Sequence, residues 1–482
     1  MLRILRPLLA TAIAFPLAHL GTASLRANSQ LPLINGNFEE GLKGWTLKAP
    51  DGTEPATVSP EAASLGQKGL RVTNLAEGQK FELVSDPLPV TAGKTYTVSF
   101  WSGGGGEKPG SVSIKMVFSG PKSSNQTMEV LPPDMAQIRK WPGAECSGSI
   151  YFGNDLLAAA APAGATQLTI HIIPKRGSSV GTSVDFDDFT VTELAPPVAA
   201  TPRDPMLGNP VPPTDPALLQ SMLDEIRKDP TRGKTPPRIV LKLDDLKPIK
   251  GGGIHQRWLK VAEFAAKKNI KVSFGIIAGT MDTDAPAFFS WVKEKHAAGH
   301  IEFWHHGWDH AGDGKIMEFS GQPYDHQKDH MTRANALAKE KLGFAFASFG
   351  APFNATDDVT VRVLQEDPDI KVWMYGKPRT PAGKIVLRRS GAVNLEAPTI
   401  IANYGAFIVG YAHNRGAEYF VLQGHPAGWG DDRYAEFVKI VEFLIEQKAD
   451  FVLPRDFISN PPKAAPQPGE DAATEKPGAK GD

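Results

Sequence analysis

The chain has 482 residues and carries 52 basic against 53 acidic side chains. That length exceeds what one ordinary hydrophobic core holds, so we expect two folded domains with tails. The near-zero net charge provides no overall field that attracts nucleic acid or an anionic membrane surface. The single cysteine, Cys146, excludes an internal disulfide and leaves no lipid-accepting cysteine near the N-terminus.

Residues 1–27 have the layout of a secretory signal peptide. Arg3 and Arg6 precede an apolar run from about Pro7 to Leu20, and small residues follow. The run is too short to span a bilayer well, and no later segment approaches the ~20 apolar residues of a transmembrane helix. We therefore expect export to the periplasm, the cell surface or the medium without stable membrane insertion. An uncleaved membrane anchor is the alternative.

Residues 31–194 form a succession of short strands separated by turns. Apolar and polar residues alternate in segments 95–101, 111–118, 167–172 and 184–191. Alternation over runs of this length is typical of antiparallel strands with one buried face. A β-sandwich is therefore the expected architecture.

The same region resembles the jelly-roll carbohydrate-binding modules that accompany polysaccharide-degrading enzymes. The resemblance rests on the segments 37–39 and 44–45, 93–96, 162–165 and 185–188. In such modules a structural calcium often joins the first and last strands through oxygen ligands. That would make Glu39 and Asp187 the calcium ligands here, and two solvated acids are the alternative. Trp101, Trp141 and Tyr151 are candidates for stacking on sugar rings, with core packing as the alternative for each.

Two segments lack the patterns of a folded core. Proline and small residues dominate from about Ala195 to Pro216, so residues 195–236 are assigned as a semi-extended linker and the lead-in to a second domain. Residues 461–482 mix Ala, Pro, Lys and Glu without apolar periodicity, and we predict that they are disordered.

Residues 237–460 alternate strand-like apolar runs with amphipathic helices. We predict strands at 238–243, 272–277, 301–304, 346–349, 371–374, 385–387 and 419–423, and helices at 255–268, 285–298 and in a segment ending near Leu342. This alternation predicts parallel β/α units, either closed into a barrel or arranged as an open sheet. In both forms, functional side chains gather at the carboxyl ends of the strands.

Side chains suited to catalysis fall at those strand ends. Asp244 and Asp245 follow the first strand, His306 follows the third, and His425 ends a later one. His306 and His310 are four residues apart, which places both imidazoles on one face of a helical turn. Two imidazoles and a carboxylate form a set of ligands for a catalytic divalent metal, with positions open for water and substrate.

The spacing of two histidines is not specific by itself. His326 and His330 are also four residues apart, in a polar helix with an apolar stripe that includes Met331 and Leu342. We interpret this second pair as surface residues.

The order of the segments resembles that of the polysaccharide deacetylases, carbohydrate esterase family four. That family has an Asp-Asp pair after its first strand, a His-x-x-x-His segment after its third, an Arg-x-Pro segment after its fourth and a late Leu-x-x-His. The corresponding segments here are 244–245, 306–310, 350–353 and 422–425. The resemblance covers most of the second domain and implies a distorted (β/α) barrel.

The resemblance also implies a role for each matching residue. Asp245, His306 and His310 would bind a divalent metal, with zinc expected and cobalt or nickel as alternatives. Asp244 would be the base that takes a proton from the attacking water, and His425 would protonate the leaving amine or alcohol.

Three further residues would form the substrate pocket. A backbone N–H near Phe353, after Pro352, would help the metal to stabilise the oxyanion, and Trp373 would line the acetyl pocket. Plainer roles stay open, because Asp244 could cap the following turn, His425 could be a core histidine, and Pro352 could merely end a strand.

Two departures distinguish this chain from the family. Gly350 stands where the family has arginine, so the partner that orients the catalytic carboxylate is absent or supplied by another residue, with Arg388 and Arg389 as candidates. The first motif reads Leu-Asp-Asp-Leu, where the family usually has an aromatic residue before the acids and glycine after them.

The sequence thus predicts an exported metal-dependent hydrolase that removes acetyl groups from a polysaccharide or cell-wall glycan, by amide or ester deacetylation. Two alternatives remain open. One is a non-catalytic carbohydrate-binding protein with a degenerate barrel, which Gly350 favours. The other is a metal-dependent hydrolase of another glycan bond.

Overall fold

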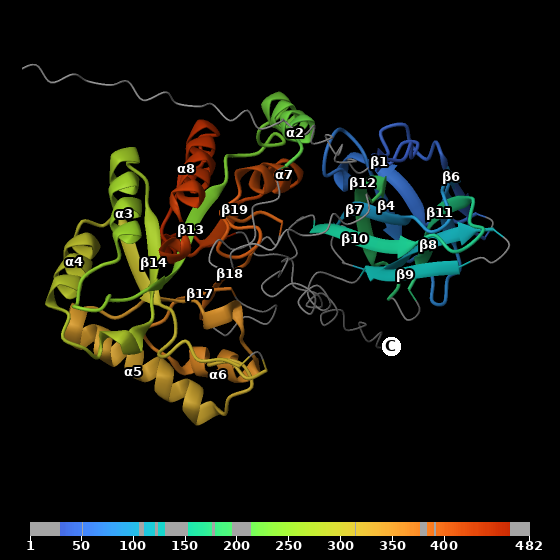
Figure 1. Ribbon diagram of the computed structural model, residues 1–482. Coiled ribbons are helices and arrows are strands. Elements are labelled where there is room, and N and C mark those ends of the chain that lie inside the picture. The colour runs from blue at the N-terminus through green and yellow to red at the C-terminus, as the bar shows by residue number, and fades with distance from the viewer. Residues whose placement is uncertain are drawn as a thin grey trace, which may run out of the picture.

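The computed structural model describes residues 29–50, 52–105, 110–120, 124–130, 153–175, 179–194, 214–313, 315–375, 383–389 and 392–462. Within them, a β-rich unit precedes an α/β unit, as Figure 1 shows. The predicted signal peptide, Trp141, Tyr151, the proline-rich segment 195–213 and residues 463–482 of the tail lie outside the described residues. In the described part of the chain, no helix is long and apolar enough to cross a membrane.

The first unit is a sandwich of two antiparallel sheets, as predicted. One sheet has the order β10-β7-β12-β4-β3 with β1 paired to β12, and the other has the order β2-β5-β11-β8-β9 with β6 paired to β11. In β11, Leu168, Ile170 and Ile172 are fully buried and the residues between them are not, which is the period of two that the sequence indicated. The strands are β1 (Ser29–Gln30), β2 (Trp45–Lys48), β3 (Ala56–Ser59), β4 (Gly69–Thr73), β5 (Glu82–Ser85), β6 (Leu88–Pro89), β7 (Thr95–Gly105), β8 (Val112–Ser119), β9 (Ser124–Val130), β10 (Gly153–Ala160), β11 (Gln167–Pro174) and β12 (Ser183–Glu193).

The second unit is a parallel sheet of order β18-β17-β16-β15-β14-β13-β19, with β20 also paired to β13. Helices α3 to α8 lie around its outside (Figure 1). Its strands are β13 (Arg238–Leu246), β14 (Val272–Ile276), β15 (Ile301–His305), β16 (Ser348–Phe349), β17 (Val372–Met374), β18 (Ile385–Leu387), β19 (Tyr419–Gly424) and β20 (Asp450–Phe451). Its helices are α3 (Gln256–Lys268), α4 (Pro286–Ala297), α5 (Tyr324–Leu342), α6 (Asp358–Glu366), α7 (Tyr404–Asn414), α8 (Asp431–Glu446) and α9 (Asp456–Ser459).

The parallel sheet curves into a nearly closed barrel. A buried cluster joins Leu387 of β18 to Tyr419 and Val421 of β19, which are the two ends of the strand order. Val240 and Trp304 belong to the same cluster and therefore face the barrel interior. The predicted distorted barrel is confirmed, and the open sheet is excluded.

Alternation along β13 separates the two faces of the barrel wall. Ile239, Leu241 and Leu243 belong to the large core cluster that includes the surrounding helices, whereas Val240 belongs to the interior cluster. Because side chains of a strand alternate between faces, Lys242 lies on the interior side with Val240. The polar residues of the site extend this interior face.

The lead-in to the barrel contains a helix that was not predicted from the sequence. Helix α2 (Pro216–Lys228) begins where the proline-rich composition ends, and its N-cap Asp215 accepts a hydrogen bond from the N–H of Ala217 at 2.8 Å. The helix packs against α7. The barrel unit therefore includes residues that composition alone placed before it.

Candidate active site

An irregularity in β13 brings two adjacent carboxylates to one site. In a regular strand, neighbouring side chains point to opposite faces. The register of β13 against β14 shifts between Leu243 and Leu246, and Asp245 has a φ of 76°. A bulge of this kind redirects a side chain. As a result, Asp244 Oδ2 lies 3.8 Å and Asp245 Oδ1 lies 3.3 Å from Nε2 of His306.

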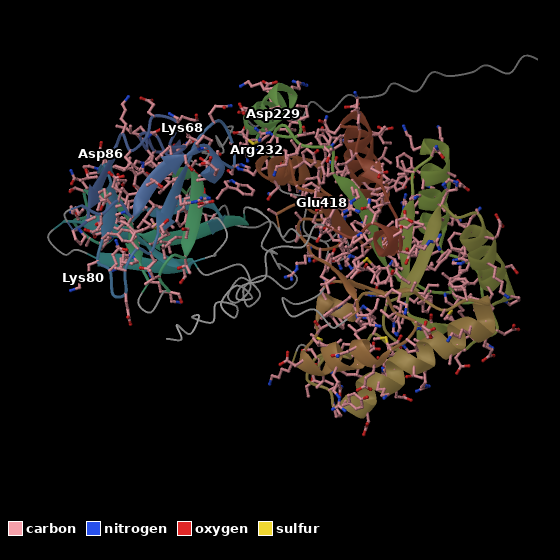
Figure 2. The ribbon with its side chains drawn as sticks, turned by 180° about the vertical axis from the view of Figure 1, so that it is seen from behind. Lys68, Lys80, Asp86, Asp229, Arg232 and Glu418 are labelled. Carbon is pink, nitrogen blue, oxygen red and sulfur yellow. The ribbon has the colours of Figure 1, made fainter. Side chains whose placement is uncertain are left out.

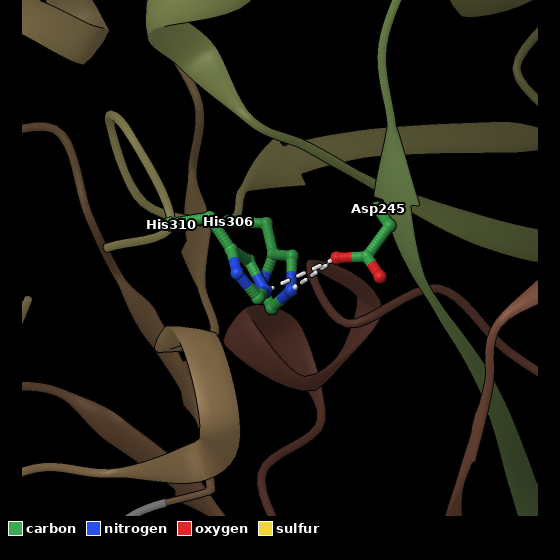
Figure 3. Close-up of side chains that lie close together, drawn as sticks. All are labelled: Asp245, His306 and His310. Carbon is green, nitrogen blue, oxygen red and sulfur yellow. Dashed lines mark ion pairs between the residues drawn. The ribbon is translucent and has the colours of Figure 1, made fainter. Parts of the chain in front are cut away.

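Asp245, His306 and His310 converge on one point, as Figure 3 shows. Asp245 Oδ1 is 3.3 Å from Nε2 of His306 and 3.2 Å from Nε2 of His310. This oxygen is buried and accepts no hydrogen bond from the described residues. Burial alone raises the pKa of Asp245, but the two imidazoles outweigh it and hold that pKa well below its usual value. A buried anionic oxygen beside two imidazole nitrogens fits a divalent metal.

The tautomer of His306 suits metal binding. Its Nδ1 is 2.7 Å from the carbonyl oxygen of Gly350. A carbonyl only accepts hydrogen bonds, so Nδ1 carries a proton, and Nε2 is the ring nitrogen that faces Asp245. A backbone acceptor that fixes the ligand ring in this way is a common second layer around protein metals.

The segment from His306 to His310 is not a helical turn, which corrects the geometric reason given for their spacing. Gly307 and His310 have φ values of 77° and 57°, so the chain folds back as a loop. A Cβ at Gly307 would lie 2.5 Å from both Glu318 Oε2 and Pro352 Cγ, so only glycine fits. The imidazoles still meet, but through an irregular loop.

Buried Glu318 holds this loop in place. Its carboxylate accepts the N–H of Trp308 at 2.5 Å and the N–H of His310 at 2.8 Å. It also contacts Nδ1 of His330 at 3.0 Å, so His330 is buried rather than on the surface as predicted. Asp309, Glu318 and His330 form a second group with metal-ligand geometry. Because N–H donors already occupy both Glu318 oxygens, we assign this group to holding the loop.

Asp244 is a buried carboxylate with a cation on both oxygens. Lys242 Nζ lies 2.8 Å from Oδ1 and 2.6 Å from Oδ2, and Gln423 Nε2 donates to Oδ2 at 2.6 Å. Burial alone raises the pKa of Asp244, but the charge of Lys242 and the nearby imidazoles outweigh it and keep the pKa below its usual value. Asp244 is therefore an ionised acceptor beside the triad of Asp245, His306 and His310.

The cation on Asp244 is Lys242 and not Arg388 or Arg389, the two candidates from the sequence. The N–H of Arg388 donates to the Tyr419 hydroxyl at 3.1 Å, and the Arg389 guanidinium lies 5.6 Å from the Tyr375 ring centroid. Because Lys242 lies two residues before Asp244 on the same strand, the alternation of β13 could have identified it.

His425 is held by a carboxylate that no sequence motif indicated. Its Nδ1 is 2.7 Å from Oε2 of Glu396, and its backbone N–H donates to Oε1 at 2.7 Å. Burial lowers the pKa of His425, but Glu396 outweighs it, and the pKa rises to about 9. Nε2 of His425 lies 4.0 Å from Asp244 Oδ2. A protonated imidazole therefore stands beside the ionised carboxylate, and it can donate a proton from Nε2.

The three predicted pocket residues have different places. Pro352 is buried against the Gly307 turn, and Phe353 is 44% exposed with its ring centroid 4.5 Å from that of His310. Trp373 is fully buried in the large core cluster on the helix side of the barrel wall, whereas its neighbours in β17 belong to the interior cluster. The structure therefore brings Phe353 next to His310 and does not bring Trp373 there.

Glu39 and Asp187, the candidate calcium ligands, both contact the segment 64–68. Asp187 Oδ2 accepts the N–H groups of Ser64 and Leu65 at 2.8 and 3.0 Å, and Glu39 Oε1 accepts those of Gln67 and Lys68 at 2.7 and 2.9 Å. Burial raises the pKa of Asp187 to about 7. Both carboxylates thus accept backbone N–H groups of this segment, and Asp187 Oδ2 also accepts the Ser64 hydroxyl at 3.3 Å.

Trp101, a candidate for sugar stacking, lies in a contact between the two units. Its ring stacks on His413 of α7 with centroids 3.7 Å apart and an angle of 11° between the planes. The Ser64 hydroxyl is 2.9 Å from His413 Nδ1 on the same side. Figure 2 shows Asp229 and Arg232, after α2, on the side of the barrel that faces the sandwich. Trp101 is therefore buried against protein.

Comparison with protein families finds a match in the first unit. Residues 32–134 match a family model described as a carbohydrate binding domain, which confirms the predicted resemblance. A search of curated proteins finds no match for the chain.

Several solved structures are similar to parts of the chain. A Family 16 carbohydrate-binding module is 15% identical and covers 33% of this chain and 97% of its own, with a TM-score of 0.24. The Xyl-CE4 domain of a multidomain xylanase from the hindgut metagenome of Trinervitermes trinervoides is 14% identical, over 46% of this chain and 90% of its own, with a TM-score of 0.32. A family 4 acetyl xylan esterase from Clostridium thermocellum, in complex with cobalt, is 14% identical over 46% of this chain and 91% of its own, with a TM-score of 0.33.

Proposed function

We propose that the protein is an exported, metal-dependent polysaccharide deacetylase. The observation that carries the proposal is the arrangement of three functional groups around one point. Asp245, His306 and His310 form a triad with metal-ligand geometry. The ionised Asp244 lies 3.8 Å from Nε2 of His306, and the protonated His425 lies 4.0 Å from Asp244. Base, acid and metal ligands are the parts that metal-assisted acyl transfer needs.

The donor set favours a borderline metal. Two imidazoles and one carboxylate suit zinc, with cobalt and nickel as alternatives, better than calcium or magnesium, which prefer oxygen ligands. Such a metal, when bound, polarises the substrate carbonyl and lowers the pKa of water.

The chain's own residues then move the protons. Asp244, fixed by Lys242 and Gln423, accepts the proton of the attacking water. His425 donates a hydrogen bond from its Nδ1–H to Glu396 and keeps that proton. It delivers the Nε2 proton to the leaving nitrogen or oxygen. The products are acetate and a free amine or hydroxyl on the glycan.

The geometry favours acyl transfer over cleavage of a glycosidic bond. Most glycosidases place two free carboxyl groups on either side of the scissile bond. Here Asp245 lies between the imidazoles of His306 and His310. Asp244 is the one carboxylate left to act as the base, and the acid is His425. A single base and an imidazolium beside one metal suit a carbonyl centre that becomes tetrahedral.

The polysaccharide and the location belong to the same proposal. The match of residues 32–134 to a carbohydrate binding domain supports a glycan substrate, because such a domain would hold the barrel near its polymer. The signal-peptide layout of residues 1–27 supports export to the periplasm, the cell surface or the medium.

The proposal is tested by acetate release from acetylated chitin oligomers, peptidoglycan and acetylated xylan. The full chain is stripped with a chelator and assayed before and after addition of zinc, cobalt or nickel. We expect acetate from at least one glycan, only with metal present. No acetate from any of the three glycans with any of the three metals contradicts the proposal.

A further inference from the structure

We propose that Lys242 is the positioning residue for Asp244 and that Gly350 keeps open the space that Lys242 occupies. The inference rests on the proposed function, because it assigns a partner to the base of that site. It also gives Gly350 a role, where the sequence suggested a lost arginine and an inactive barrel.

The contact between Lys242 and Asp244 is short, two-sided and shielded from water. Lys242 Nζ reaches both carboxylate oxygens, at 2.8 and 2.6 Å, and the side chains are 0% and 1% exposed. A donor on both oxygens fixes the plane of the carboxylate as well as its position. A buried carboxylate without such a partner destabilises the folded protein, so we expect loss of the Lys242 ammonium to lower the free energy of unfolding.

Gly350 leaves free the space beside the lysine stem. A Cβ at position 350 would lie 2.9 Å from Lys242 Cε, 2.8 Å from Cζ3 of Trp304 and 2.8 Å from the carbonyl oxygen of Met374. All three separations are shorter than real Cβ contacts, so a side chain at 350 meets the Met374 carbonyl and the Trp304 ring as well as the lysine stem. An arginine at position 350 and Lys242 in its present place exclude each other.

The aromatic residues around Lys242 also suit a cation. Lys242 Nζ lies 4.8 Å from the Trp304 ring centroid and 5.2 Å from that of Tyr375, so two aromatic faces line the ammonium. The Gly350 carbonyl also accepts the Nδ1 proton of His306. Gly350 therefore contacts the metal ligand His306 through its backbone carbonyl. Its lack of a side chain leaves room for Lys242, the partner of the base Asp244.

The first test separates positioning from stability by kinetics on the full chain. In metal-loaded Lys242→Met we expect kcat for acetate release to fall about 100-fold with metal content retained. Since Lys242 acts through Asp244, Lys242→Met combined with Asp244→Asn is expected to be no slower than Asp244→Asn alone. The matched control is Lys268→Met, which removes an ion pair with Glu442 on the helix surface and leaves kcat unchanged.

Two results overturn the proposal in this test. One is a Lys242→Met enzyme with the kcat of the parent. The other is a double variant whose fold loss in kcat is the product of the losses in the two single variants.

Lys242→Gln keeps an N–H donor without the charge. We expect its kcat to lie between those of the parent and Lys242→Met.

The second test needs no turnover. We expect Lys242→Met to lower Tm by about 10 °C in the parent and by clearly less in Asp244→Asn, where no carboxylate is left unpaired. Gly350→Ala should lower Tm more in the parent than in Lys242→Ala, where the stem is gone. Equal shifts in both backgrounds overturn the proposal. If no glycan yields acetate, the proposed function fails. The two comparisons of Tm shifts, for Lys242→Met and for Gly350→Ala, still decide the role of Lys242.

Discussion

Glu396 contacts His425 twice, with Oε2 at 2.7 Å from the ring Nδ1 and Oε1 at 2.7 Å from the backbone nitrogen. Trp429 Nε1 also donates to Oε1 at 2.7 Å, so the carboxylate is held from a third direction. Burial lowers the pKa of His425, and the Glu396 charge outweighs it and raises the pKa to about 9. The relationship makes His425 an acid over most of the neutral range.

Glu396→Gln should therefore move the alkaline limb of the pH–rate profile. The acid form of His425 is present below pH about 9 and is lost as the pH rises through about 9, so kcat falls there. Without the Glu396 charge, we expect the fall to shift toward the ordinary histidine pKa of about 6.5. Acetate release between pH 5 and pH 10 measures the shift. An alkaline limb that stays in place contradicts the role of Glu396.

The same pair should make stability depend on pH. A folded-state pKa raised above the unfolded value adds stability below the unfolded pKa, about 6.5, and that stability is lost as the pH rises to about 9. We expect the free energy of unfolding of the parent to fall between these values by more than that of Glu396→Gln. Urea denaturation across this range checks the difference, and parallel curves for the two proteins oppose it.

Glu318→Ala should weaken metal binding without removing a ligand. Glu318 accepts the N–H groups of Trp308 and His310, so its loss frees the loop that carries the His310 imidazole. We expect zinc affinity to fall about 10- to 100-fold, the usual effect of losing a residue that supports a ligand. Competition with a chromophoric chelator measures the affinity. Glu340→Ala, at an exposed position on α5, is the control and should bind zinc as the parent does.

Trp101→Ala should destabilise the contact between the two units. The Trp101 ring is buried on His413, so its truncation is expected to cost about 3–5 kcal/mol of unfolding free energy. Trp101→Phe keeps a ring on His413 and should cost less. Chemical denaturation compares the three proteins, and an alanine variant as stable as the parent contradicts the buried contact.

Trp373→Phe should leave turnover nearly unchanged. Trp373 lies on the helix side of the barrel wall, so it does not meet the substrate. We expect kcat/KM within about threefold of the parent, with any loss appearing in Tm instead. A large rise in KM for the acetylated glycan would show that Trp373 contacts the substrate and would contradict this placement.

The parts of the site that repeat a regular pattern could be predicted from sequence. Asp244 and Asp245 end an apolar strand and His306 follows another, so their convergence follows from parallel topology. Alternation along a strand also indicates which face of the barrel wall a side chain occupies. It places Lys242 with Asp244 on the interior face, and it places Trp373 on the opposite face from its neighbours.

Other parts could not be predicted because they depend on irregular backbone and on distant contacts. Glu396 meets His425 from a loop 29 residues earlier, with no motif to mark it. The His306–His310 loop depends on positive φ values at Gly307 and His310 and on Glu318, and only Gly307 was a visible signal. Gly350 was interpreted as a missing arginine, because the volume that Lys242 takes is not apparent without coordinates.

The most direct test of the central claim separates Asp244, the base, from Asp245, the ligand. Metal content and acetate release are measured together for the parent, Asp244→Asn and Asp245→Asn. We expect Asp244→Asn to keep about one metal per chain and to lose acetate release at least about 1,000-fold, and Asp245→Asn to lose the metal itself. An Asp244→Asn protein that binds metal and releases acetate at the parental rate contradicts the account.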